Sequence, residues 1–191
     1  VNGDITVPDG STWTVVGGAG GGGTPGVRYQ QGKITPEDPV SGVTLSVGEG
    51  LWSRIGNSVS IQYLVTSGSP GDGNACGLTL PYAATNDDPT FGSSVGSVMF
   101  KKISIGNDQL LTPYVAANSS YLMLYKSPQI GGEWSALAGN SIQAGSTFFI
   151  TLTYLTSDST FDPTNGATVT EDIQGSGGGG SGGGDVIYNG A

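Results

Sequence analysis

The residues of this chain whose types could support acid–base chemistry are three pairs of adjacent carboxylates: Glu37-Asp38, Asp87-Asp88 and Glu171-Asp172. Glycosidases use two carboxylates, and the distance between them separates inverting from retaining hydrolysis. Neighbouring side chains of an extended chain point to opposite sides, so adjacency in the sequence does not place two carboxylates at one bond. We therefore interpret the three pairs as solvated loop charges and predict no catalytic residue.

Histidine is absent and cysteine occurs once, as Cys76. Without histidine, the chain cannot build Ser-His-Asp or Cys-His nucleophiles or a histidine-ligated zinc site. With one cysteine, it has no intrachain disulfide and no metal site made of several thiolates. Cys76 precedes Gly77 at the start of a predicted strand, so we expect it to be a small buried apolar residue.

Two segments carry oxygen ligands of the kind that calcium takes: Asp158 to Gly166 and the turn Asp72-Gly73-Asn74. Neither segment has the spacing of an EF-hand loop, and Asp and Asn are common turn residues for purely conformational reasons. The sequence therefore predicts no metal and no cofactor, with a loop-bound calcium ion left as an alternative.

Two aromatic residues on predicted loops are candidate ligand contacts. Tyr82 lies in a Pro-Tyr-Ala-Ala-Thr-Asn segment, and Trp134 follows a glycine pair by two residues. Binding residues concentrate on loops, and an aromatic ring with a polar tip suits stacking on a sugar. By contrast, Tyr63 and Tyr154 share a face with aliphatic residues in their predicted strands, so we expect them to pack in the core.

Fifteen acidic and six basic residues give the chain a net charge of −9 and a pI near 4.1. A surface that neutralises nucleic-acid phosphates is therefore not expected. Charged residues make up only 11% of the chain, against about 25% in an average soluble protein. The longest apolar stretch with aromatic content, Tyr121 to Tyr125, is far too short to span a membrane, and no signal peptide opens the chain. The chain begins at Val1 rather than Met, which leaves its completeness at both ends open.

Period-two alternation is the pattern that recurs along the chain. Val59, Ile61, Tyr63 and Val65 fall on one face of a predicted strand, with Leu64 as the apolar exception on the other. Residues 148 to 154 repeat the pattern, with Phe149 as the exception. Short segments with the same β preference are 43–47, 77–80, 98–105, 110–116 and 121–126, and turn residues separate them at 48–50, 71–74, 106–108, 118–120 and 131–132.

The sequence predicts an all-β fold, an antiparallel β-sandwich of jelly-roll-like form. Glycine supplies 35 of the 191 residues, and each glycine inside a helix costs about 1 kcal/mol relative to alanine. We expect almost no helix, with at most one short turn between residues 128 and 144. The predicted organisation is a β arm (1–16), a Gly/Pro linker (17–40), the sandwich (41–157), and a Ser/Thr/Gly-rich tail with a terminal short strand (158–191).

The N-terminal arm has the composition of a small hairpin. Ile5-Thr6-Val7 and the stretch from Thr12 to Val16 flank the turn Pro8-Asp9-Gly10-Ser11. An isolated hairpin is only marginally stable in water. The arm should therefore pack against a partner, which is either the main domain or another subunit.

The stretch Leu51 to Ile61 resembles bacteriophage fibre and tail-fibre modules, in which an aromatic residue is followed by Arg, Ile or Val, Gly and Asn at the opening of a long strand. Segments between Gly106 and Ile150 are similar to the rest of such a module. Ile5 to Val15 resembles the repeats that stack along trimeric fibre shafts. Gly184 to Ala191 resembles the strand-forming spacer that follows Gly-rich segments in those proteins.

The resemblance implies a non-enzymatic homotrimeric virion protein on the exterior of a phage particle, with sandwich heads around a threefold axis. Its partners would be sister chains, other virion proteins and a host surface glycan, with no nucleic acid and no membrane insertion. Capsid decoration and a free, monomeric carbohydrate-binding module remain alternatives. The expected contacts between subunits are Trp13, Val15, Val186 and Tyr188.

Overall fold

The computed structural model describes residues 27–86, 93–103, 105, 109–128 and 131–174. These residues form strands β1 to β11 and one short 3-10 helix, η1 (Gly139–Ser141), which confirms the all-β prediction. The predicted arm (1–16) and the Gly-rich part of the tail lie outside the described residues. So do Asp87-Asp88 and the four expected subunit contacts, Trp13, Val15, Val186 and Tyr188.

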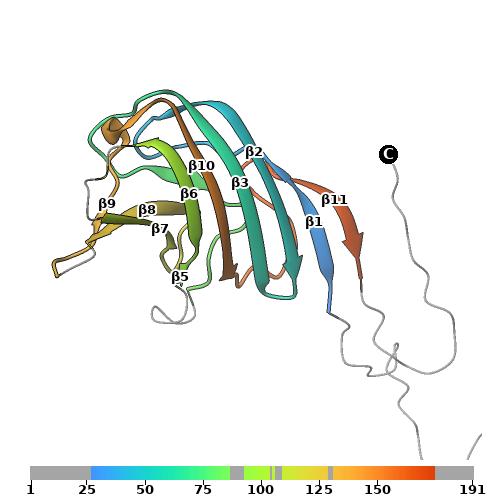
Figure 1. Ribbon diagram of the computed structural model, residues 1–191. Helices are drawn as coiled ribbons and strands as arrows, with labels where there is room; N and C mark the ends of the chain where they lie inside the picture. Colours follow the sequence, from blue (N-terminus) through green and yellow to red (C-terminus); the bar gives the residue numbers. More distant parts are fainter. Residues whose placement is uncertain (1–26, 87–92, 104, 106–108, 129–130, 175–191) are drawn as a thin grey trace, which may run out of the picture.

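A six-stranded antiparallel sheet is the larger of two layers (Figure 1). Its order is β11-β1-β2-β3-β10-β6. The long strands β2 and β3 form a hairpin whose turn is Gly56-Asn57. The strand bounds are β1 (Tyr29–Ile34), β2 (Thr44–Ile55), β3 (Ser58–Ser69), β6 (Ser97–Ile103), β10 (Ile142–Leu155) and β11 (Thr168–Ile173).

The second layer is a smaller antiparallel sheet of order β4-β8-β7-β5, with β9 paired to β8. Its strands are β4 (Gly77–Thr79), β5 (Ser94–Val95), β7 (Gln109–Val115), β8 (Tyr121–Pro128) and β9 (Ser135–Ala136). The two antiparallel sheets make the predicted β-sandwich.

The core between the sheets comes from the alternation that the sequence displays. Val59, Ile61, Tyr63 and Val65 are each 2% exposed or less, and Leu122 and Leu124 of the small sheet are fully buried. The two predicted exceptions, Leu64 and Phe149, lie on the opposite face of the large sheet from this core, which confirms the period-two interpretation. Burial also raises the pKa of the Tyr63 and Tyr154 phenols, as expected of core tyrosines.

The sheet extends beyond both predicted limits of the sandwich. The part of the expected linker at 29–34 is strand β1, and the part of the expected tail at 168–173 is strand β11. These strands pair with each other, and β1 also pairs with β2. Both segments are short and rich in polar residues, so their apolar periodicity is weak. The residues 29–34 and 168–173 form strands because they pair with segments far away in the sequence, not because of their own apolar pattern.

The expected turn at Gly48-Glu49-Gly50 is wrong, because these residues continue strand β2. Gly50 pairs with Ile34 and with Tyr63, and its Cα faces the core. A Cβ added there would lie 2.7 Å from the Ile34 Cγ2 and 2.8 Å from the Tyr63 ring. Glycine is therefore used at this position for close packing under a tyrosine, not for a turn.

Candidate functional site

Three aromatic side chains gather on the outer face of the small sheet. The ring centroids of Tyr114 and Tyr125 are 5.4 Å apart, and Trp134 lies 5.5 Å from Tyr114 and 5.1 Å from Tyr125. Trp134 is 59% exposed, while both tyrosines are partly exposed. We call these three residues the aromatic cluster.

Strand alternation places the two tyrosines. Tyr114 of β7 precedes buried Val115, and Tyr125 of β8 follows buried Leu124, so both rings project away from the core. Thr112 lies directly opposite Tyr125, which sets the two tyrosines on a diagonal within reach of each other. Trp134 precedes β9, which pairs with β8 beside Tyr125.

The aromatic cluster offers ring faces with polar tips. The Tyr114 hydroxyl donates a hydrogen bond of 3.0 Å to the Ser93 hydroxyl, which holds that ring in place. The Tyr114 ring meets the other two nearly edge-on, at interplanar angles of 86° and 83°. Such an arrangement suits a ligand that combines apolar faces with hydroxyl groups, as a sugar ring does. The predicted ligand contact Trp134 thus lies in a cluster of exposed rings. Tyr114 and Tyr125, the other two members, are not among the predicted ligand contacts, although strand alternation indicates that both point outward.

Tyr82, the other predicted ligand contact, is a core residue. It is 1% exposed, and its ring packs edge-on against Trp52 at 5.4 Å. Its hydroxyl donates a 2.7 Å hydrogen bond to the buried Gln30 amide oxygen. Burial raises the pKa of the Tyr82 phenol above its ordinary value. The prediction is wrong because the loop that carries Tyr82 folds inward between the two sheets.

A buried arginine, Arg54, lies against the Tyr82 ring. The Arg54 guanidinium is stacked between rings, 4.6 Å from the Tyr82 centroid and 3.7 Å from that of Phe161. It donates hydrogen bonds to the Gly56 carbonyl, to the Asp158 carboxylate at 2.9 Å and to the Asp158 carbonyl. The side chain of Arg54 has no exposed surface. Arg54 therefore ties the segment after β10 to the large sheet.

Two of the three carboxylate pairs lie among the described residues, and Glu171-Asp172 belongs to strand β11 rather than to the solvated loop that we expected. Asp172 bonds Arg28, and its neighbour Glu171 bonds Gln31. The hydrogen bond from Arg28 lowers the pKa of Asp172, against the opposing effect of partial burial.

Asp38 corrects our expectation of solvated loop charges. It is 9% exposed and accepts hydrogen bonds from the amides of Val40, Ser41, Val43 and Gly77 and from the Ser41 hydroxyl. Such a carboxylate fixes the conformation of a loop. Cys76 beside it is 2% exposed and burial raises the pKa of its thiol, which confirms the prediction of a buried, apolar cysteine.

The candidate calcium segments are internally bonded. Asp158 accepts hydrogen bonds from Arg54, from the Phe161 amide at 2.8 Å and from the Thr160 hydroxyl at 2.9 Å. Asp72 accepts from the amide and the side chain of Asn74. Within the described residues no group of three or more His, Cys, Asp or Glu side chains could hold a metal ion.

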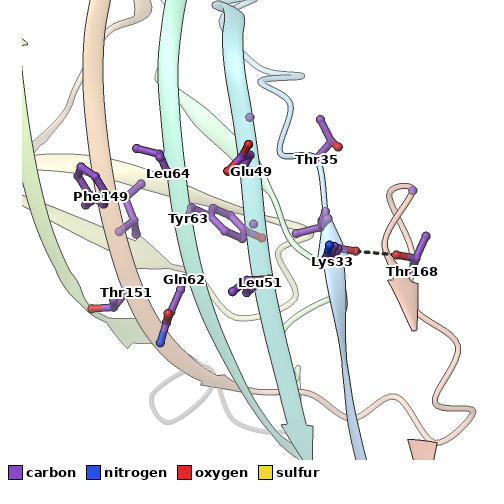
Figure 2. A pocket seen from close by; sticks show the side chains of 15 residues that line it. Lys33, Thr35, Glu49, Leu51, Gln62, Tyr63, Leu64, Phe149, Thr151 and Thr168 are labelled. Atoms are coloured by element: carbon purple, nitrogen blue, oxygen red, sulfur yellow. Dashed lines mark hydrogen bonds between the residues drawn. The ribbon is translucent and has the colours of Figure 1, made fainter. Parts of the chain in front are cut away.

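A shallow groove of about 660 Å³ crosses the outer face of the large sheet over β1, β2, β3 and β10 (Figure 2). Its floor is apolar: Leu51, Leu64 and Phe149 lie on neighbouring strands, with Leu64 paired directly with Phe149. Polar side chains of Lys33, Glu49, Gln62, Thr151 and Thr168 surround that floor. We call it the outer groove.

Comparison with known proteins gives one structural likeness. No family model matches the chain, and no curated protein matches it. Among solved structures, the crystal structure of the Dettilon tailspike protein (gp208) is similar over 66% of this chain, with a TM-score of 0.52 and 15% sequence identity. The aligned part covers 23% of the tailspike chain, so the likeness concerns the fold of one module.

In the part of the chain that the structure describes, no helix has the length and apolar character needed to cross a membrane.

Proposed function

We propose that this protein is a non-enzymatic attachment module on the exterior of a bacteriophage virion, and that its aromatic cluster contacts a host surface glycan. The observation that carries the proposal is the exposed cluster of Tyr114, Tyr125 and Trp134. The likeness of the fold to part of a phage tailspike supports a tail-associated setting.

An uncharged glycan is the ligand class that fits best. The protein carries a net charge of −9, which disfavours acidic polysaccharides through long-range repulsion. Tryptophan and tyrosine offer apolar ring faces for the C–H face of a sugar and polar tips for its hydroxyl groups. Neither of these contacts requires a charged partner.

Substitution of Trp134 tests this proposal. We expect Trp134→Ala to weaken binding to a panel of immobilised neutral bacterial oligosaccharides at least tenfold, equivalent to about 1.4 kcal/mol. Trp134→Phe keeps a ring face and should retain most of the binding. The control is Leu155→Ala, which removes a 44% exposed side chain from the other sheet. Equal binding by native protein and Trp134→Ala contradicts a glycan contact at this cluster.

The absence of catalysis is the second part of the proposal. Three described carboxylates, Asp38, Asp158 and Asp172, are committed to hydrogen bonds that hold the fold together. The competing function is depolymerisation of the same glycan. Release of oligosaccharide from host surface glycan, abolished by Asp87→Asn or Asp88→Asn, would establish the enzyme and overturn this part.

Homotrimeric assembly is the third part. It rests on the resemblance to fibre modules and on the predicted terminal strand of the tail, which needs a partner. We expect sedimentation equilibrium to give three times the 19.2 kDa chain mass. A mass of one chain favours the free carbohydrate-binding module. Capsid decoration, the other alternative, predicts density on the capsid face rather than at the tail in images of the particle.

A further inference from the structure

The outer groove leaves a compact set of large apolar side chains uncovered. Leu51 is 55% exposed, Phe149 49% and Met99 of the neighbouring strand β6 67%. Leu64, Phe149 and Met99 occupy one row across β3, β10 and β6, and Leu51 lies diagonally next to Leu64. Contiguous exposed apolar side chains of this kind mark a surface that another chain segment covers.

We propose that the chain's own N-terminal arm, residues 1–16, docks in the outer groove. The first described residues, Val27 and Arg28, lead directly into β1, and Lys33 of β1 and Thr35 just after it line the groove. The arm therefore joins the described part of the chain at a strand that borders the groove.

The spacer between the arm and β1 is long enough for this docking. Residues 17–26 span up to about 33–36 Å when extended. Reaching β10 from β1 requires three strand spacings, about 15 Å, and the groove begins only a few residues along β1 from Tyr29. Seven of the ten spacer residues are glycine, so the spacer can turn back over the sheet.

The chemistry of the arm matches that of the groove. Trp13 and Val15 are two residues apart, so in an extended segment they share one face and can cover the row formed by Leu64 and Phe149. The groove carries one charge of each sign, Lys33 and Glu49, so apolar contact rather than charge supports the match. A sugar is a poorer occupant here than at the aromatic cluster, because Phe149 is the one aromatic ring among the four uncovered apolar side chains and has no polar tip.

A double-mutant cycle in the full-length protein tests the contact. Trp13→Ala and Phe149→Ala each lower the urea midpoint of unfolding, and the double variant should lower it by less than the sum of the two shifts. The matched control pairs Trp13→Ala with Leu110→Ala on the small sheet, whose side chain is 57% exposed against 49% for Phe149, and here the shifts should add. Additive shifts in both pairs overturn the proposal.

Cross-linking tests the same contact independently of stability. Ser11→Cys with Gln62→Cys should give a disulfide within one chain under mild oxidation, because Ser11 shares the face of Trp13 and Val15 and Gln62 lies beside Leu64. Cys76 does not compete, since it is 2% exposed. Ser11→Cys with Leu110→Cys should stay reduced. A disulfide between two chains, or one of equal yield at Leu110, contradicts docking of the arm on its own groove.

Discussion

Arg54 places a positive charge in the core, because its guanidinium has no exposed surface. A buried charge is tolerated only when paired and hydrogen-bonded. Asp158 supplies both requirements, with its carboxylate and its carbonyl, and the rings of Tyr82 and Phe161 cover the two faces of the guanidinium.

We therefore expect Asp158→Asn to destabilise the protein by about 1–3 kcal/mol, since the amide restores the shape but not the charge opposite Arg54. The measurement is urea unfolding at pH 7. Asp162→Asn is the matched control, because Asp162 is exposed and lies in the same segment; its effect should stay within about 0.5 kcal/mol. Equal effects of the two substitutions would mean that Arg54 does not need its partner.

The sequence predicted residue roles well where strand alternation decides them and poorly where a distant partner does. Tyr63 and Tyr154 were predicted as core residues because their neighbours alternate. Tyr82 was not, because its burial depends on Gln30 and Arg54, which reach it from strands remote in the sequence. Arg54 is charged, and the residues near it in the sequence give no sign that Asp158 and the rings of Tyr82 and Phe161 pack against it. Its burial could therefore not be predicted.

At the scale of elements, β11 is the strand whose attachment depends most on one position. Gly32 of β1 lies between β11 and β2, and it pairs with Val169 and Trp52. A Cβ on Gly32 would lie 1.8 Å from the Thr168 carbonyl oxygen and 2.7 Å from the Trp52 ring. Backbone cannot yield to such a contact as a flexible side chain does.

Gly32→Ala should consequently loosen β11 and cost about 1–3 kcal/mol, the usual range for overpacking. Hydrogen exchange is the readout: amides of residues 168–173 should lose protection before those of β3 and β10. Gly73→Ala is the control, because the nearest atom to its added Cβ is 3.9 Å away. Unchanged protection of β11 in Gly32→Ala would contradict this reading of the contact.

The existence of β3 and β10 was predictable, whereas the full length of β2 was not, because Gly48 and Gly50 inside it indicate a turn. β3 and β10 display period-two alternation over most of their length, so the sequence indicates both. β1 and β11 have little apolar periodicity, and their composition resembles a linker and a tail. The aromatic cluster falls between these cases: alternation exposes Tyr114 and Tyr125, but only the pairing of β8 with β9 brings Trp134 to them.

At the scale of the whole molecule, the carboxylates of Asp158 and Asp172 make the free energy of unfolding depend on pH. Partial burial alone would raise the pKa of Asp158, but hydrogen bonds from Arg54, the Phe161 amide and Thr160 outweigh it and lower that pKa. The Arg28 hydrogen bond likewise lowers the pKa of Asp172. A lowered folded-state pKa means that the unfolded chain binds more protons in acid, so stability rises with pH in that range.

The stability that Asp158 and Asp172 contribute should therefore be fully present above the ordinary carboxyl pKa of about 4. It should be lost as the pH falls through the lower pKa values that these two groups have in the folded protein. The double substitution Asp158→Asn with Asp172→Asn should flatten this decline. Thermal unfolding at a series of pH values from neutral to strongly acidic measures both proteins. Parallel curves for the two proteins would show that other groups control acid unfolding.

The pairing of the first and last described strands also has a mechanical meaning. Tyr29 of β1 lies opposite Ile173 of β11, so both ends of the described chain leave from the same end of one antiparallel pair (Figure 1). Because hydrogen bonds in such a pair run across the strands, tension between the two ends loads them one after another, as in peeling, instead of all at once in shear. The β1–β11 pair is thus the seam that opens first under load, while the β2–β3 hairpin and the core behind it stay closed.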